Sequence, residues 1–219
     1  GHIWSLKNWF SKIKNFKTKY IIFYMGINEN LKNRPDTLFD LNKDNLSLKQ
    51  KIKYYIQRNN GFLYKIYNIA AKKYYNLYMN TGYEVFFPEY TETNNKFIPN
   101  QNQKINLVNN LSEIKKLTFE LNAIPIFVTQ RTQYWKNING KILLANNVIY
   151  NNRDYYNFEK FIAETIVNYC KENDIFYVDI FNNIKFELED HFELAHTTEK
   201  GSQKIADYVF EKINQRYDF

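Results

Sequence analysis

The sequence contains little cysteine, glycine and proline: one cysteine, six glycines and four prolines in 219 residues. A single cysteine, Cys170, excludes an internal disulfide framework and a cysteine-rich zinc site. Cys170 continues the helical pattern of apolar residues between Phe158 and Tyr169. We therefore expect it to be a small core residue and not a nucleophile.

Long apolar runs are also absent. The longest, such as Tyr20 to Met25 and Ile124 to Val128, are far shorter than the roughly 20 residues that a membrane-spanning helix needs. The chain also lacks a charged start followed by an apolar stretch and a small-residue cleavage site, so these residues contain no signal peptide. We expect no membrane segment in this chain.

The net charge is +7, and the sequence pI is about 9.1. Such a charge permits attraction to phosphates. The lysines, however, are scattered singly among Asn, Tyr and Ile, with no dense basic block and no nucleic-acid-binding motif. Nucleic acid is therefore not an expected partner.

Short apolar runs rich in β-branched and aromatic residues predict three strands, at Tyr20–Met25, Ile124–Val128 and Ile175–Asp179. Their continuous apolar character is typical of parallel strands buried on both faces. Helical spacing of apolar residues predicts helices at residues 3–17, 46–58, 61–79, 105–121, 158–169 and 205–213. Loops or irregular segments are predicted at residues 30–45, 81–103 and 130–150.

The alternation of helices and short strands predicts an α/β fold, with a parallel sheet covered on both faces, in a single domain over residues 1–219. Three strands make a narrow sheet for so many helices, and the pattern opens with a helix that no strand precedes. We therefore expect the domain to be truncated at its N-terminus and to lack its first strand or strands.

Ligands of open parallel sheets bind beyond the carboxyl ends of the strands. The first predicted strand ends in Gly26-Ile27-Asn28-Glu29. A glycine there lets the backbone approach a substrate, and the Asn28 amide is able to donate a hydrogen bond to an oxyanion. The alternative is a turn in which the Asn28 side chain bonds its own backbone.

A second candidate site lies just before the last predicted helix. Glu193 precedes His196 by three residues, so its carboxylate is placed to hold the imidazole in one tautomer and leave the other nitrogen as a general base. Thr197 or Thr198 is placed to cap the helix. The alternative is a surface histidine before a cap, whereas a zinc site at His191 and His196 lacks a metal-ligand spacing.

The order of these segments resembles that of the SGNH (GDSL-type) serine hydrolases over nearly the whole chain. The resemblance rests on the Gly-Ile-Asn, Ile-Pro-Ile-Phe-Val-Thr-Gln, Val-Asp-Ile and Phe-Glu-Leu-Ala-His-Thr-Thr-Glu-Lys-Gly-Ser segments. It implies a three-layer α/β/α sandwich with a flavodoxin-like parallel sheet. It also implies His196 as general base, Asn28 as oxyanion donor and Gly1 as the second-block glycine whose N–H faces the oxyanion, with no cofactor or metal.

Two features depart from the family pattern. The Gly-Asp-Ser block that supplies the nucleophile is absent, and none of the serines Ser5, Ser11, Ser47, Ser112 and Ser202 follows a buried strand as that block does. We expect the block upstream of Gly1. The family's triad aspartate is replaced by Glu193, one methylene longer, with Asp190 as a fallback acid.

The resemblance implies an ester hydrolase that acts on acyl or acetyl esters, of carbohydrates or lipids among others, through a serine acyl-enzyme. We expect the 219-residue chain alone to be inactive. Two alternatives stay open: a non-catalytic domain that binds a carbohydrate or a partner protein, and an acyltransferase that uses the same residues. Arg131, Tyr134 and Trp135 of the segment 130–150 either line the substrate pocket, together with residues 81–103, or belong to packed surface loops.

Overall fold

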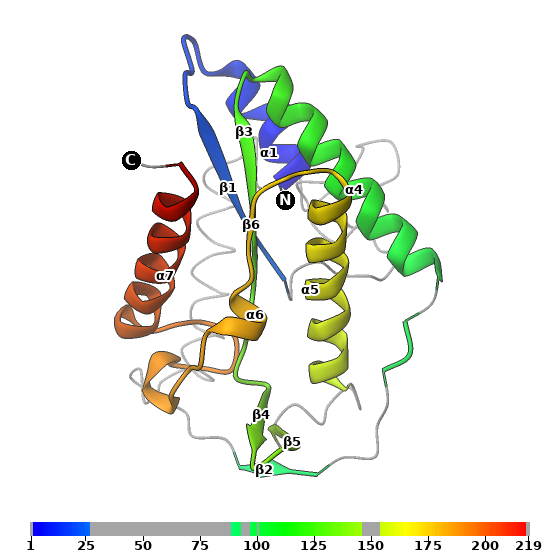
Figure 1. The fold of residues 1–219 in the computed structure, drawn as a ribbon, viewed down its shortest axis with the longest axis vertical. Coiled ribbons are helices and arrows are strands. Elements are labelled where there is room, and N and C mark those ends of the chain that lie inside the picture. Colours follow the sequence, from blue (N-terminus) through cyan, green and yellow to red (C-terminus); the bar gives the residue numbers. More distant parts are fainter. Residues whose placement is uncertain (1, 27–88, 93–96, 100, 146–153, 218–219) are drawn as a thin grey trace, which may run out of the picture. The chain divides into compact units, whose positions relative to one another are not determined.

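The structure, a computed structural model, describes residues 2–26, 89–92, 97–99, 101–145 and 154–217, all within one compact unit. They form a parallel sheet in the order β1-β3-β6 and a small antiparallel sheet in the order β2-β5-β4 (Figure 1). The predicted helices 46–58 and 61–79 and the loop 30–45 lie outside the described residues. None of the helices in the described ranges is long and apolar enough to cross a membrane.

The three predicted strands form the parallel sheet. β1 (Tyr20–Met25) pairs along its full length with β3 (Ile124–Thr129), and β6 (Tyr177–Val178) pairs with the other side of β3. β3 is central, and five of its six residues are buried, as the prediction of a strand covered on both faces requires. The α/β class predicted from the alternation is therefore confirmed.

The two outer strands differ from the prediction. In β1, Ile22 is 50% and Tyr24 is 39% exposed, because β1 is an edge strand among the described residues and one of its faces is only partly covered. β6 is shorter than predicted at both ends: Ile175 and Phe176 precede the ladder, and Asp179 leaves it. The Asp179 carboxylate instead accepts a hydrogen bond from the backbone N–H of Asn182 and caps the short helix α6 (Ile180–Asn183).

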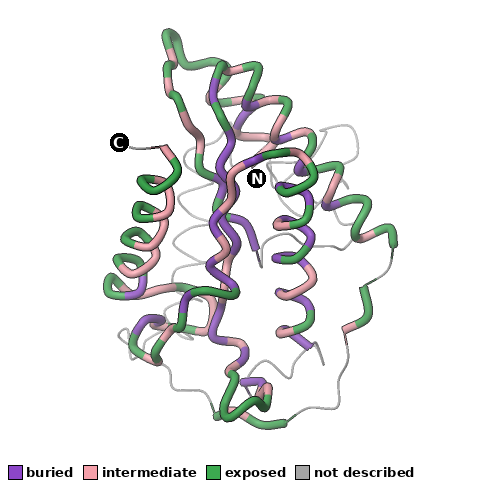
Figure 2. Tube along the Cα trace, viewed as in Figure 1, coloured by how far each residue is buried: buried purple, intermediate pink, exposed green. Residues whose placement is uncertain are grey.

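Successive residues of β3 contact two different apolar clusters. Phe127 belongs to a cluster with residues of α1 (His2–Asn8), α4 (Gln101–Glu120) and α5 (Tyr155–Glu172). Ile126 and Val128 belong to a second cluster, which residues of α7 (Glu199–Tyr217) partly cover. Figure 2 shows this distribution as buried positions along the central strands and along one side of α5. Cys170 lies in the first cluster, fully buried, and burial raises the pKa of its thiol to about 12, as expected of a core cysteine.

The helix predicted over residues 3–17 is wrong in its length. α1 ends at Asn8, and a single 3₁₀ turn, η1 (Phe10–Lys12), follows. The rings of Phe10 and Phe16 pack 5.3 Å apart across a turn in which Asn15 has φ 60°. This left-handed residue is incompatible with a continuous helix.

The segment 130–150 is not simply a loop, because it contains a β-hairpin. β4 (Trp135–Ile138) and β5 (Lys141–Ala145) are joined by Asn139 and Gly140, both with positive φ, and β5 also pairs with β2 (Tyr90–Thr91). Asn-Gly between two β-rich runs is the strongest short-range hairpin signal. The end of the predicted irregular segment 81–103 is also corrected, since α4 begins at Gln101.

Candidate active site

The second candidate site lies on the terminal loop, residues 184–198, which connects α6 to α7. The loop contains a 3₁₀ turn, η4 (Leu188–Asp190), and then doubles back on itself. His191 forms an antiparallel bridge with Thr197, and the Phe192 N–H donates a hydrogen bond of 3.1 Å to the carbonyl of His196. This closed turn carries Glu193 and His196 on its outer side, where both side chains are about half exposed or more.

The structure brings Glu193 and His196 together. Oε1 of Glu193 contacts Nδ1 of His196, and the imidazole stacks on the Phe192 ring with a centroid distance of 5.8 Å. A carboxylate at Nδ1 holds the proton on that nitrogen and leaves Nε2 as the basic one. The contact is the one that the spacing of the two residues predicts, and their catalytic role stays a prediction.

Asp190, the fallback acid, is bound elsewhere. Its side chain is buried, and its Oδ2 accepts hydrogen bonds from Nζ of Lys204 at 2.9 Å and from the backbone N–H of Glu187 at 2.8 Å. Burial alone would raise the pKa of Asp190, but these two hydrogen bonds and the Lys204 charge hold it below its usual value. Asp190 therefore fastens the terminal loop to α7 and is not placed as the partner of His196.

Thr198 and Gly201 join the terminal loop to the first turn of α7. Of the two predicted capping residues, Thr198 accepts the hydrogen bond from the Gly201 N–H, whereas the Thr197 hydroxyl bonds the Ser202 hydroxyl at 2.8 Å. A Cβ on Gly201 would lie 1.9 Å from the carbonyl oxygen of Asp190. Only glycine permits this approach of helix and loop.

The substitution Gly201→Ala is expected to lower the free energy of unfolding by about 1–3 kcal/mol, because the added methyl must push the Asp190 backbone away. The measurement is urea unfolding of the variant beside Gln203→Ala, a substitution in the same helical turn for which a change within about 0.5 kcal/mol is expected. A stabilised Gly201→Ala variant, as alanine gives at an unobstructed helical position, would contradict the close contact.

A segment that follows the central strand β3 also binds the terminal loop. We call residues 131–135, which follow β3, the anchoring segment. The Arg131 guanidinium donates to the Ile184 carbonyl at 2.9 Å, and the Gln133 side-chain amide donates to the Glu187 carbonyl at 2.8 Å. The backbone N–H of Gln133 donates to the carbonyl of Leu194, also at 2.8 Å. Leu194 directly follows Glu193, so the anchoring segment reaches the candidate site itself.

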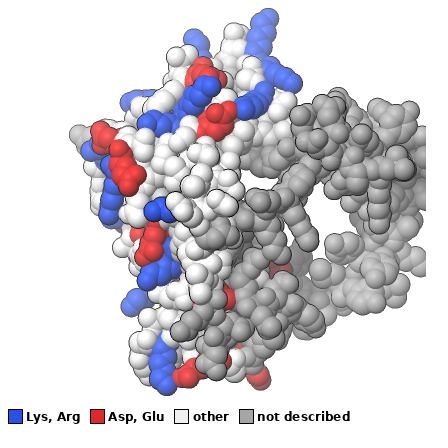
Figure 3. All heavy atoms as spheres, turned by 90° about the vertical axis from the view of Figure 1, so that its right-hand side faces the viewer, with Lys and Arg blue, Asp and Glu red and all other residues white. Residues whose placement is uncertain are grey.

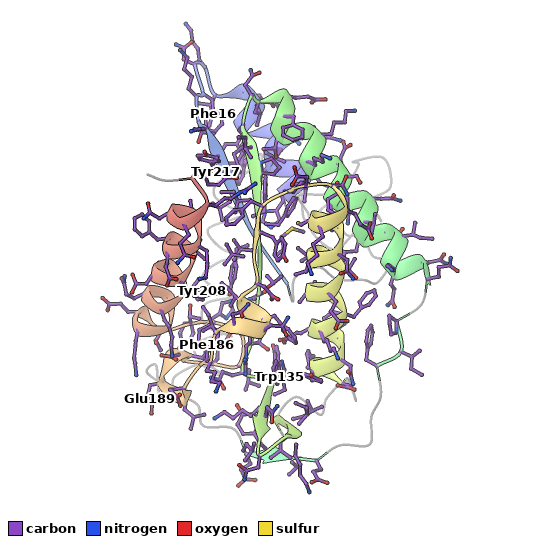
Figure 4. All side chains as sticks on the ribbon, in the orientation of Figure 1. Phe16, Trp135, Phe186, Glu189, Tyr208 and Tyr217 are labelled. Carbon is purple, nitrogen blue, oxygen red and sulfur yellow. The ribbon has the colours of Figure 1, made fainter. Side chains whose placement is uncertain are left out.

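Trp135 of the anchoring segment is packed among the described residues. It is 5% exposed, its indole N–H donates to Glu159 at 3.0 Å, and the Arg131 guanidinium lies 4.4 Å from its ring centroid. Tyr134 stacks on Tyr155 with a centroid distance of 4.3 Å. Of the two interpretations left open for this segment, packing is the one that holds for Trp135. Figure 4 shows it at the start of the hairpin, with Phe186 and Glu189 on the terminal loop.

Sequence reasoning missed Glu159, a buried carboxyl group in α5 that bonds the anchoring segment. Burial raises the pKa of Glu159 to about 7, although hydrogen bonds from Thr132 and Trp135 and the charge of Arg131 oppose the shift. A signal was present in the sequence. Position 159 precedes Ile162 and Ala163 by three and four residues, which places a glutamate on the apolar stripe of the helix.

The first candidate site is described only at its glycine. The ends of β1 and β3 lie side by side, and a Cβ on Gly26 would come within 2.2 Å of Cβ of Gln130. Gly26 is therefore required for close packing at the end of the strand. Asn28 and Gly1, the expected oxyanion groups, lie outside the described residues.

His191 is buried beside the candidate site, at 2% exposure, with the Phe186 ring edge-on at 4.8 Å. Neither ring nitrogen makes a hydrogen bond of good geometry among the described residues. Burial lowers the pKa of His191 to about 4, although the Asp190 charge and a backbone contact with Arg131 oppose the shift. Within the same residues, no group of three or more His, Cys, Asp and Glu side chains is placed to hold a metal ion.

Charged side chains of both signs are mixed over the described part of the face in Figure 3. They do not gather into a continuous basic surface on the described part of this face. A comparison with known protein families, a search of curated proteins and a search of solved structures each found no match. The described residues thus define an α/β protein with an exposed Glu–His pair on a loop beside its parallel sheet.

Proposed function

We propose that this chain is the greater part of an SGNH-type serine hydrolase that cleaves acyl or acetyl esters. The contact between the Glu193 carboxylate and Nδ1 of His196 is the observation that carries the proposal. It pairs an acid with a histidine in the arrangement that activates a serine hydroxyl. The segments that resemble the family support the assignment but do not identify the ester.

The proposal includes a finer architecture, in which the parallel sheet is the middle layer of a flavodoxin-like α/β/α sandwich. Two features support it. Residues of β3 contact α4 and α5 in one cluster and α7 in the other. β1, like β6, is an edge strand among the described residues, and the proposal puts a further parallel strand, ending in the Gly-Asp-Ser block, beside β1.

In the proposed mechanism, the hydroxyl of that serine attacks the ester carbonyl while Nε2 of His196 takes its proton. Glu193 holds the ring and stabilises the imidazolium that forms. The side-chain amide of Asn28 and the backbone N–H of Gly1 donate hydrogen bonds to the tetrahedral oxyanion. His196 then returns the proton to the leaving alcohol, and water repeats the sequence to release the acid.

The test is to treat the full-length native protein with a fluorophosphonate, whose phosphorus an activated serine hydroxyl attacks with loss of fluoride, and to map the phosphonylated peptide by mass spectrometry. We expect one modified serine outside residues 1–219, together with hydrolysis of p-nitrophenyl acetate that the reagent abolishes. Heat-denatured protein is the control. Absence of both modification and hydrolysis would overturn the proposal in favour of a binding domain, and acetylation of an added sugar in place of acid release would indicate an acyltransferase.

A further inference from the structure

Glu159 and His196 lie on different elements, yet a short series of hydrogen bonds connects them. Glu159 lies in α5, and His196 lies on the terminal loop. Both elements contact the anchoring segment. The connection therefore runs from a buried carboxyl group, through five consecutive residues, to the loop that carries the Glu–His pair.

The first link is the set of hydrogen bonds that Glu159 accepts. The backbone N–H of Thr132 donates to Oε2 of Glu159 at 3.3 Å, the Thr132 hydroxyl donates to Oε1, and the indole N–H of Trp135 donates to Oε2 at 3.0 Å. Glu159 is 3% exposed, so water does not compete for these bonds. The carboxyl group fixes both ends of the turn between β3 and β4.

The second link is the next peptide group along the chain. While the Thr132 N–H points to Glu159, the N–H of Gln133 points to the carbonyl of Leu194. Fixing one peptide orients its neighbour, because only two soft dihedral angles separate them. Leu194 adjoins Glu193 and precedes His196 by two residues, so a shift of this carbonyl displaces both members of the pair.

We propose that Glu159 is a positioning residue for the Glu193–His196 pair. It acts through the anchoring segment and touches neither residue of the pair. The consequence for catalysis rests on the proposed function, since a misplacement of about 1 Å in a catalytic group costs on the order of a hundredfold in rate. The consequence for the geometry of the terminal loop does not depend on that function.

The choice of variants separates positioning from core packing. Glu159→Leu keeps much of the volume of the side chain but removes both acceptor oxygens, so the N–H groups of Thr132 and Trp135 lose their partner. Thr132→Val removes one of the donors with little change in volume. The matched control is Thr165→Val. Like Glu159, Thr165 is buried and lies in α5, but its hydroxyl donates to the Phe161 carbonyl within the helix and does not contact the anchoring segment.

The primary measurement is amide hydrogen exchange, because it requires no activity. In Glu159→Leu, we expect the N–H groups of Gln133 and Phe192 to exchange about tenfold faster or more relative to the N–H of Leu111 in α4, whose exchange reports global unfolding. Thr132→Val should act in the same direction, and Thr165→Val should leave the Gln133 and Phe192 rates unchanged relative to Leu111. If Glu159→Leu does not fold, Thr132→Val decides the question.

The second measurement is the pH dependence of kcat/KM for ester hydrolysis by the full-length native protein. We expect Glu159→Leu to lower kcat/KM about 10- to 100-fold and to shift the pKa of the essential base, whereas Thr165→Val does neither. Wild-type exchange at Gln133 and Phe192 in both test variants would overturn the inference. If the test variants exchange faster but the wild-type protein has no esterase activity, the positioning role is supported and the proposed function is overturned. Failure of the inference and failure of the proposed function are therefore distinguishable.

Discussion

The substitution His196→Ala in the full-length native protein is expected to lower kcat/KM for ester hydrolysis by about 10²–10⁴-fold, the usual contribution of a positioned general base. The His196 side chain is 70% exposed and lies outside the apolar clusters, so the free energy of unfolding should change little. Steady-state kinetics and urea unfolding of the same preparation measure both quantities. Unchanged turnover would remove His196 from the mechanism.

The acid is tested by comparing substitutions at Glu193 and Asp190. Glu193→Gln keeps an acceptor for Nδ1 of His196 but loses the charge that stabilises the imidazolium, and a loss of about 10²–10⁴-fold in kcat is expected. Asp190→Asn should instead act on stability, because Asp190 bonds Lys204 and the Glu187 backbone. The opposite pattern, in which Asp190→Asn alone impairs turnover, would restore Asp190 as the triad acid.

The pH dependence of stability should contain a contribution of about 3 kcal/mol from His191. Its folded pKa is about 4, against 6.5 for a free histidine, so the unfolded chain binds a proton over this interval and the folded protein does not. The contribution is fully present above pH 6.5. It is lost as the pH falls from 6.5 toward 4, because burial disfavours the charged imidazolium more than the neighbouring Asp190 charge favours it.

Glu159 should act with the opposite sign. Its folded pKa is about 7, against 4.5 for a free glutamate, so the folded protein retains a proton that the unfolded chain has lost. The associated stability, again about 3 kcal/mol, is present below pH 4.5 and is lost as the pH rises through 7. Between pH 4.5 and 6.5 one contribution rises with pH as the other falls, so their changes nearly cancel.

Urea unfolding between pH 4.5 and 7 should separate the two groups. We expect a nearly constant unfolding free energy in the wild type, a rise with pH in Glu159→Gln, where only His191 is left to titrate, and a fall with pH in His191→Leu. The wild type is the reference for both slopes. Three parallel curves would contradict the assignment of the titration to these two groups.

Among the described elements, the sequence predicts best those whose buried residues follow a regular pattern along the chain. β3 is a continuous apolar run and became the central strand, and α5 follows its apolar stripe from Tyr155 to Glu172. The prediction of a loop over residues 130–150 overlooks the hairpin of β4 and β5, although Asn139-Gly140 is a strong hairpin signal. The helix over 3–17 was overextended because the pattern does not show the contact between Phe10 and Phe16 that turns the chain.

By itself, the sequence determined the three strands of the parallel sheet, the α/β class and the pairing of Glu193 with His196. That pairing needs only the three-residue separation within one turn. Tertiary structure decided what holds the pair in place, since Gln133 bonds Leu194 across about sixty residues of sequence and Glu159 bonds Thr132 across 27. Periodicity and spacing in the sequence describe residues that are close along the chain. The hydrogen-bond donors of a buried carboxyl group come from distant segments, so only the tertiary structure shows them.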